Sequence, residues 1–275
     1  MGGSPCQDLS GVNAAGQGFE SERPQLLYQM LRVFKDIVAE KHRLYHCSEN
    51  VASMTEENKN KFTSLLQVLP LRVCSRGICQ ARRPRYFWAS WEVASGPGVT
   101  ATRKKTHVDL TFTAAMPDPS LWTDPGWEWL GGAETLLPTF IRTAPKKRPG
   151  FLPAGLQSTP ADARRRWAKD QYRYPPYQYK KKFCFRSLEQ PRLLRVASVE
   201  EREILMFLGM AATRYCLNPV EAKSSPIAWE DARCKLIGNT FHPGWWWRCY
   251  CRRCCPGVHR SQRWDVDGVT DAVVD

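Results

Sequence analysis

The sequence predicts an α/β protein. Apolar residues recur at helical spacing between Leu27 and Val38, strand-like segments follow between residues 44 and 91, and helical patterns return after Ser198. The chain has 275 residues, of which 43% are hydrophobic and 24% charged, so it is long enough and apolar enough to fold around a core.

The first third of the chain alternates helix and strand. Pro24 suits the first turn of the helix that carries the apolar face described above. Residues 44–47 indicate a short strand that ends at Glu49-Asn50-Val51. This would place the Glu49 carboxylate at the edge of a sheet, where open α/β folds bind their ligands. The next expected elements are a helix over 56–69 and strands over 71–74 and 80–91.

The rest of the chain is less regular until Ser198. The periodic spacing of apolar residues fades over residues 92–190. The Pro and Gly content of residues 126–160 makes a partly disordered linker an alternative interpretation there. Ser198 and Glu201 then form a capping box that begins a helix. A further helix is expected over 226–236, before Gly238-Asn239-Thr240.

Charge favours a polyanionic partner. Forty Lys and Arg residues stand against 27 Asp and Glu residues, a net charge of +13, although simple solubility is the alternative explanation. Basic clusters in the middle region are interleaved with aromatic residues, a combination that suits nucleic acid. The residues expected to bind DNA are Lys146, Lys147, Arg148, Arg164, Arg165, Arg166, Lys180, Lys181 and Lys182.

The sequence carries no sign of a membrane partner or of secretion. It lacks both a run of about 18 apolar residues and an N-terminal charged segment followed by an apolar one. The 11 cysteines are spread along the chain, so reduced thiols and an intracellular location are expected.

Five short motifs occur in a characteristic order. They are Gly2-Gly3-Ser4-Pro5-Cys6-Gln7, Glu49-Asn50-Val51, Arg83-Pro84-Arg85-Tyr86-Phe87-Trp88, Glu200-Glu201-Arg202-Glu203 with Phe207-Leu208-Gly209, and Gly238-Asn239-Thr240. A cysteine in a turn of small residues is usually a thiol without a catalytic role. Five motifs in this order are, however, hard to produce by chance. The chain resembles the carbon-5 DNA (cytosine) methyltransferases over about residues 1–244, and eukaryotic de novo-type members in particular.

The resemblance implies catalytic roles for Cys6, Glu49, Arg85 and Arg83. The Cys6 thiolate would add to carbon 6 of a cytosine that is flipped out of the duplex, which activates carbon 5. Glu49 would contact N3 and the exocyclic amine of the base and neutralise the charge that develops there. Arg85, with Arg83 alongside, would hydrogen-bond the base carbonyl. Solvated charges on a strand are the alternative explanation for the two arginines.

The family uses S-adenosylmethionine, and the resemblance places Pro5 and Asn239 beside this cofactor. Family members begin with a Phe-x-Gly-x-Gly turn that cradles the cofactor, and no such turn precedes Cys6 here. We therefore expect a truncated Rossmann-like S-adenosylmethionine-dependent methyltransferase sheet. We also expect the chain to be the C-terminal part of a methyltransferase and to be unable to methylate DNA in isolation, because the cofactor-binding segment is missing.

The expected organisation follows from the motifs. Residues 1–91 would belong to the catalytic domain, 92–190 would form an irregular target-recognition region, 191–244 would close the catalytic domain, and 245–275 would be an atypical tail rich in Cys, Trp and Arg. Duplex DNA in the nucleus is the expected substrate. RNA is the second choice, because a transfer-RNA branch of the family shares the thiol chemistry. No protein partner is predicted.

Two other functions stay open. One is a catalytically inactive DNA-binding remnant, and the other is a cysteine-rich, metal-binding interaction module formed by the tail. Only Cys251 and Cys254 have the spacing of a structural zinc knuckle, so no metal ligand is predicted. The candidate zinc ligands would be Cys249, Cys251, Cys254 and Cys255 with His242 or His259.

Overall fold

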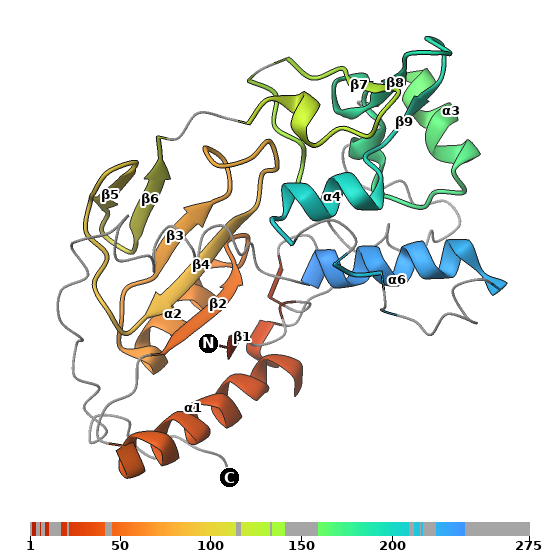
Figure 1. Cartoon of the computed structure of the whole chain (residues 1–275). Helices are drawn as coiled ribbons and strands as arrows, with labels where there is room; N and C mark the ends of the chain where they lie inside the picture. The colour runs from red at the N-terminus through yellow and green to blue at the C-terminus, as the bar shows by residue number, and fades with distance from the viewer. Residues whose placement is uncertain are drawn as a thin grey trace. The chain divides into compact units, whose positions relative to one another are not determined.

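The structure is a computed structural model of the chain (Figure 1). It describes residues 2–3, 6, 9–10, 18–20, 22–41, 46–113, 117–132, 134–140, 159–208, 212–214, 216 and 224–239. These residues form two compact units. Unit 1 contains the described residues up to Cys74 and those of Pro84–Thr113, and unit 2 contains Ser75–Arg83 and those from 117 to 239.

Unit 1 is built on a mixed sheet. Its five main strands are, in spatial order, β2 (Cys47–Val51), β4 (Pro84–Ala89), β3 (Leu71–Cys74), β6 (Val108–Phe112) and β5 (Val99–Arg103). The two-residue strand β1 (Gly2–Gly3) pairs with the outer edge of β2. Strand β4 is antiparallel to both of its neighbours, whereas β1 is parallel to β2 and β3 is parallel to β6. The predicted α/β class is therefore confirmed.

Two helices and a short 3₁₀ turn complete unit 1. They are η1 (Gly18–Glu20), α1 (Glu22–Lys41) and α2 (Glu56–Leu66). The Thr55 side chain accepts a hydrogen bond from the Asn58 N–H at 3.2 Å, which caps the first turn of α2. The helix ends at Leu66, before the expected residue 69, because Gln67 adopts a left-handed conformation with φ of 54°.

The core of unit 1 centres on aromatic rings. Phe62 from α2 and Trp88 from β4 are fully buried, and their rings stack with centroids 4.8 Å apart. Phe19 adds a tilted contact with Phe62 at 5.2 Å. Helices and sheet therefore share one apolar core. The other buried members are Leu9, Leu27, Leu31, Phe34, Val51, Met54, Leu66, Val68 and Tyr86.

Some strand boundaries differ from the expectation. Helices α1 and α2 and strand β3 confirm the predicted elements. Strand β2 covers Cys47–Val51 and so ends at the Glu49 motif, as expected, but it begins at Cys47; residues 44 and 45 lie outside the described part. The strand expected over 80–91 is present only over Pro84–Ala89, because Ala81 forms an isolated bridge with Leu137 in unit 2. The sheet also continues beyond residue 91, into β5 and β6.

Unit 2 combines helices with a small antiparallel sheet. The sheet order is β7 (Trp127–Trp129), β8 (Phe185–Ser187) and β9 (Leu194–Arg195). Its α-helices are α3 (Ala161–Lys169), α4 (Val199–Leu205) and α6 (Pro226–Asn239). Its 3₁₀ turns are η2 (Pro119–Leu121), η3 (Pro176–Tyr179) and η4 (Lys181–Phe183). Strand β7 lies in the stretch for which a linker was left open; residues 141–158 of that stretch lie outside the described part.

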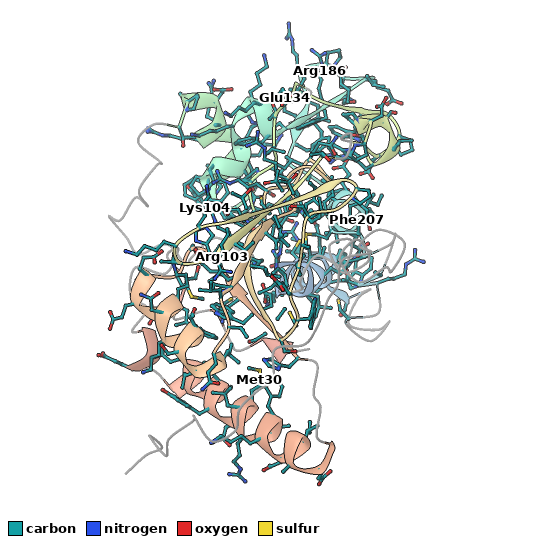
Figure 2. All side chains as sticks on the ribbon, turned by 90° about the vertical axis from the view of Figure 1, so that its left-hand side faces the viewer. Met30, Arg103, Lys104, Glu134, Arg186 and Phe207 are labelled. Carbon is teal, nitrogen blue, oxygen red and sulfur yellow. The ribbon has the colours of Figure 1, made fainter. Side chains whose placement is uncertain are left out.

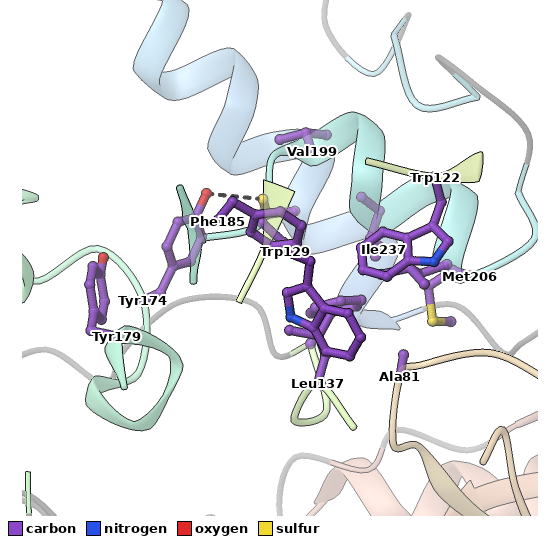
Figure 3. Close-up of a cluster of buried hydrophobic side chains, with 14 of the residues drawn as sticks. Ala81, Trp122, Trp129, Leu137, Tyr174, Tyr179, Phe185, Val199, Met206 and Ile237 are labelled. Carbon is purple, nitrogen blue, oxygen red and sulfur yellow. Dashed lines mark hydrogen bonds between the residues drawn. The ribbon is translucent and has the colours of Figure 1, made fainter. Parts of the chain in front are cut away.

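The core of unit 2 is rich in large rings (Figure 3). Trp122 makes a T-shaped contact with Phe185 at 5.8 Å and a tilted contact with Trp129 at 5.4 Å. Ile237 from α6 and Met206 after α4 are also buried in this cluster. The predicted capping box at Ser198 is confirmed, and it begins α4. Helix α6 extends past the expected residue 236, so Gly238 and Asn239 are its last residues.

The sequence predicts no membrane span and reduced cysteines for the whole chain, whereas the structure bears only on the described residues. Within the described ranges, no helix combines the length and the apolar character that a membrane span needs. Seven cysteines lie within the same ranges, and they form no disulfide with one another.

Candidate active site

The segment that carries Cys6 leaves the sheet beside Glu49. Strand β1 is parallel to β2, with Gly3 opposite Glu49, so the chain after Gly3 emerges at the same end of the sheet as the chain after Val51. The Cys6 carbonyl accepts hydrogen bonds from the Leu9 N–H at 3.2 Å and the Ser10 N–H at 2.9 Å. Cys6 is thus held in a tight turn, half-buried against the unit 1 core.

A second contact ties this turn to the end of β2. The Ser10 and Ser53 hydroxyl oxygens are 3.4 Å apart, and Ser53 follows Val51 by two residues. Leu9, only 2% exposed, anchors the same turn in the core. The turn after β1 and the turn after β2 therefore contact each other at one edge of the sheet. No sequence signal predicted this serine pair, because the two residues are 43 positions apart.

Glu49 and Arg85 form an ion pair across β2 and β4. Arg85 Nε lies 2.8 Å from Glu49 Oε1, and the side chains of Arg85 and Glu49 are 11% and 19% exposed, respectively. Glu49 is opposite Phe87 and Val51 is opposite Arg85, so the two are diagonal neighbours on one face of the sheet. Arg85 Nη1 also donates to the Pro84 carbonyl at 2.8 Å. Both charged groups are therefore held in fixed positions.

Asn50 stabilises the same strand end. It is 1% exposed, and its Oδ1 accepts a hydrogen bond from the Val51 N–H at 2.8 Å. The motif Glu49-Asn50-Val51 thus presents its carboxylate toward Arg85 and uses its amide to fix the backbone.

Arg83 lies in unit 2 and contacts backbone carbonyls. Its Nη2 donates to the Gly238 carbonyl at 2.9 Å, and its Nη1 donates to the Phe140 carbonyl at 3.4 Å. Gly238 belongs to the last turn of α6, where carbonyl groups carry partial negative charge. The described geometry gives Arg83 the role of a helix cap, and its expected contact with a base stays a prediction.

The residues expected to bind DNA are only partly described. Lys146, Lys147 and Arg148 lie outside the described residues. On α3, Arg164 and Arg165 are exposed, whereas Arg166 pairs with Asp162 at 2.9 Å and donates to the Tyr179 carbonyl at 2.6 Å. The sequence interpretation missed Lys169, which is exposed; its i+4 spacing from Arg165 could have placed it on the same face.

The third basic cluster lies at η4. Lys181 and Lys182 are exposed, and Lys180 is half-buried. No ion pair joins any of these three lysines to an acidic residue of the described ranges. Their charges are therefore available to a polyanion.

The residues expected to contact the cofactor fall at the margins of the described ranges. Pro5 lies outside them, and Asn239 is the last residue of α6 with a side chain that also lies outside them. The candidate zinc ligands of the tail lie outside as well. The described ranges contain no cluster of three or more His, Cys, Asp or Glu side chains suited to a metal ion.

The acidic motif Glu200-Glu201-Arg202-Glu203 forms ion pairs with other elements of unit 2. Glu203 Oε2 lies 3.0 Å from Arg233 Nη2 on α6, and Glu201 Oε2 lies 2.8 Å from Arg195 Nη1. Both carboxylates are fully buried. Sequence reasoning identified the motif but not its partners.

Comparison with protein-family models gave no match to this chain.

Proposed function

We propose that the chain belongs to a DNA cytosine carbon-5 methyltransferase and carries its nucleophile, its base-contacting groups and its DNA-binding region. The observation that carries the proposal is the placement of the Cys6 turn, Glu49 and Arg85 at one edge of one sheet. A Rossmann-like identity for this mixed sheet is part of the proposal.

The proposed chemistry begins with the thiolate of Cys6. Its sulfur forms a bond to carbon 6 of the cytosine, and the electron pair of the C5–C6 double bond moves toward N3. Proton donation to N3 by Glu49 neutralises this charge and leaves carbon 5 as an enamine carbon that can react with an electrophile. Once carbon 5 has gained its new substituent, a base removes the C5 proton, the thiolate leaves carbon 6, and N3 returns its proton to Glu49, which restores the neutral aromatic ring.

Arg85 suits a positioning role in this scheme. Its Nε and Nη1 are engaged by Glu49 and by the Pro84 carbonyl. Its Nη2 has no acceptor among the described residues, and this group can donate to the carbonyl oxygen of the base. Arg85 would therefore orient both the carboxylate and the ring.

The methyl group would come from S-adenosylmethionine, as the family resemblance implies. Pro5 and the side chain of Asn239, expected beside it, belong to the undescribed part of the chain. The nucleus, as the site of duplex DNA, is the proposed location.

The proposal can be tested without the cofactor. Once Cys6 has added to carbon 6, carbon 5 can take a proton from water, so reversal of the addition exchanges the C5 hydrogen with solvent. We expect the chain to release tritium from duplex DNA that contains cytosine tritiated at carbon 5, and Cys6→Ser to abolish this release. Cys74→Ser is the matched control, because Cys74 is also a half-buried thiol of unit 1 but lies on β3.

The outcomes separate the candidate functions. Release that survives Cys6→Ser, or that Cys74→Ser abolishes equally, would remove Cys6 as the nucleophile. DNA binding without any release would instead favour a catalytically inactive DNA-binding remnant, which the engagement of Arg83 with the Gly238 carbonyl supports. Tritium release from RNA but not from DNA would identify RNA, the second candidate, as the substrate.

A further inference from the structure

Unit 2 contains a cavity of about 400 Å³ beside the basic helix α3. Its walls come from α3, from the segment that follows it, from β9 and from α6. This volume lies within the range of small-molecule sites, about 300–1,000 Å³. The cavity belongs to unit 2 alone, whereas the residues proposed for methyl transfer, Cys6, Glu49 and Arg85, are in unit 1.

Two tyrosines give the cavity a rigid aromatic wall. Tyr174 and Tyr179 are 2% and 3% exposed, and both appear in Figure 3. The Tyr174 hydroxyl donates to Glu230 Oε1 at 3.0 Å, and the Tyr179 hydroxyl donates to Asp170 Oδ2. The Arg202 guanidinium lies 4.1 Å from the centre of the Tyr174 ring. These contacts hold both rings in place, and only a small part of each ring is exposed to the cavity.

The α3 side of the cavity offers unused positive charge. Arg173, on the segment after α3, is neutralised by Glu230 at 2.7 Å and Asp231 at 3.0 Å. Lys169, in contrast, has no acidic partner within the described residues. Arg166 Nε–H is shielded from solvent and lacks an acceptor there. Lys169 is exposed, so its charge is open to a ligand at the cavity. The Arg166 charge is already paired with Asp162, but a buried donor normally has an acceptor, so its Nε–H indicates an oxygen acceptor or an ordered water nearby.

Asp170 adds an acceptor to the same cavity. Its Oδ2 is occupied by the Tyr179 hydroxyl, and its Oδ1 has no donor among the described residues. A wholly anionic ligand would be repelled by this carboxyl and by Glu230. A ligand with N–H groups on a flat ring and an anionic group elsewhere would satisfy both sets of charges.

We propose that this cavity binds a nucleoside monophosphate unit, either as a free nucleotide or as an unstacked nucleotide of a nucleic acid strand. The base would lie against Tyr174 and Tyr179 with its N–H groups toward Asp170, and the phosphate would be held by Lys169 and Arg166. The site does not depend on methyl transfer at Cys6.

Isothermal titration of the chain with cytidine 5′-monophosphate tests the site. We expect binding with a dissociation constant below about 1 mM, and affinities for cytidine and for inorganic phosphate that are each weaker by about tenfold or more. Lys169→Met should lower the affinity for cytidine 5′-monophosphate by about tenfold. Lys105→Met is the matched control, because it removes the same charge from an exposed residue that does not line the cavity.

A second variant examines the base side. Asp170→Asn should lower the affinity for cytidine 5′-monophosphate and leave the affinity for inorganic phosphate unchanged. Titration with a short oligodeoxycytidine distinguishes the two sources: competition with the mononucleotide assigns the site to a strand, and its absence assigns it to free nucleotides. Failure to bind the mononucleotide, or equal losses in Lys169→Met and Lys105→Met, would overturn the proposal. Tritium release from DNA is measured separately, so either proposal can fail alone.

Discussion

At the scale of single residues, the pair of Glu49 and Arg85 shows how a sheet can present a charge to a ligand. Each group is largely removed from water, so burying either charge without a close partner would cost stability. The antiparallel register of β2 and β4 supplies that partner at a fixed diagonal. In the proposed reaction Glu49 must carry a proton before it can donate to N3, and its fixed position then leaves little reorganisation for that step.

His46 makes the stability of unit 1 dependent on pH. It precedes β2, is 2% exposed, and packs its ring against Phe34 at 5.0 Å. Burial lowers the pKa of the His46 imidazole from 6.5 to about 4. The unfolded chain takes up a proton below pH 6.5, but the folded chain does so only near pH 4, so the contribution of His46 to stability is complete above pH 6.5 and is lost as the pH falls toward 4.

We expect this residue to reduce the free energy of unfolding by about 2 kcal/mol between neutral pH and about pH 5. Urea unfolding at the two pH values, followed by tryptophan fluorescence, measures the loss. His46→Gln should remove most of it, whereas His107→Gln, a half-buried histidine of the same unit, should leave it in place. An unchanged pH dependence in His46→Gln would contradict the assignment.

At the scale of elements, local signals predicted most helices. The apolar spacing of α1 and the capping box of Ser198 and Glu201 act within a few residues, so the sequence reveals them directly. Pairing across the sheet is not local. Strand β4 lies between β2 and β3, and nothing in the segment itself states that Val51 will be opposite Arg85.

The same reason limited the prediction of the site. Cys6, Glu49 and Arg85 could be nominated from motifs, but the serine contact between the two turns and the ion pair between Glu49 and Arg85 depend on sheet register. Arg83 is the clearest case: its acceptor Gly238 lies 155 positions further along the chain. A strand pattern over residues 80–83 could not anticipate that contact.

The buried acids of α4 provide a stability prediction. Glu203 is fully buried and holds Arg233, which is itself 2% exposed, and it also accepts a hydrogen bond from the Thr213 N–H at 2.9 Å. Glu203→Ala leaves the Arg233 charge buried without this partner, so we expect the free energy of unfolding to fall by about 3–5 kcal/mol.

Glu200 provides the control for this prediction. It also pairs with Arg233, but its side chain is 42% exposed. Glu200→Ala should therefore cost less than about 1 kcal/mol. Guanidinium unfolding followed by near-ultraviolet circular dichroism gives both values. Equal losses of stability in the two variants would show that burial does not determine the strength of these pairs.

At the scale of the whole molecule, the chain carries a net charge of +13, and each unit contains an exposed run of basic residues. The proposal of DNA binding requires the position of these charges, and not the total alone, to determine affinity. Lys180, Lys181 and Lys182 lie in unit 2 among aromatic side chains. Arg103, Lys104 and Lys105 form an equally basic exposed run in unit 1, at the end of β5, where Figure 2 labels Arg103 and Lys104. The two runs allow a comparison at constant net charge.

We expect neutralisation of Lys180, Lys181 and Lys182 to alanine to weaken binding to duplex DNA, and the corresponding change at Arg103, Lys104 and Lys105 to have little effect. Each lysine that neutralises a phosphate releases counterions, so the slope of log K against log salt should become shallower by about 0.9 for every phosphate that is no longer neutralised. Measurements near 0.1 M salt, where screening acts over about 10 Å, limit the influence of remote charges. Fluorescence anisotropy with a labelled duplex gives the slopes, and identical slopes for the two triple variants would mean that net charge, not the position of the lysines in unit 2, determines binding.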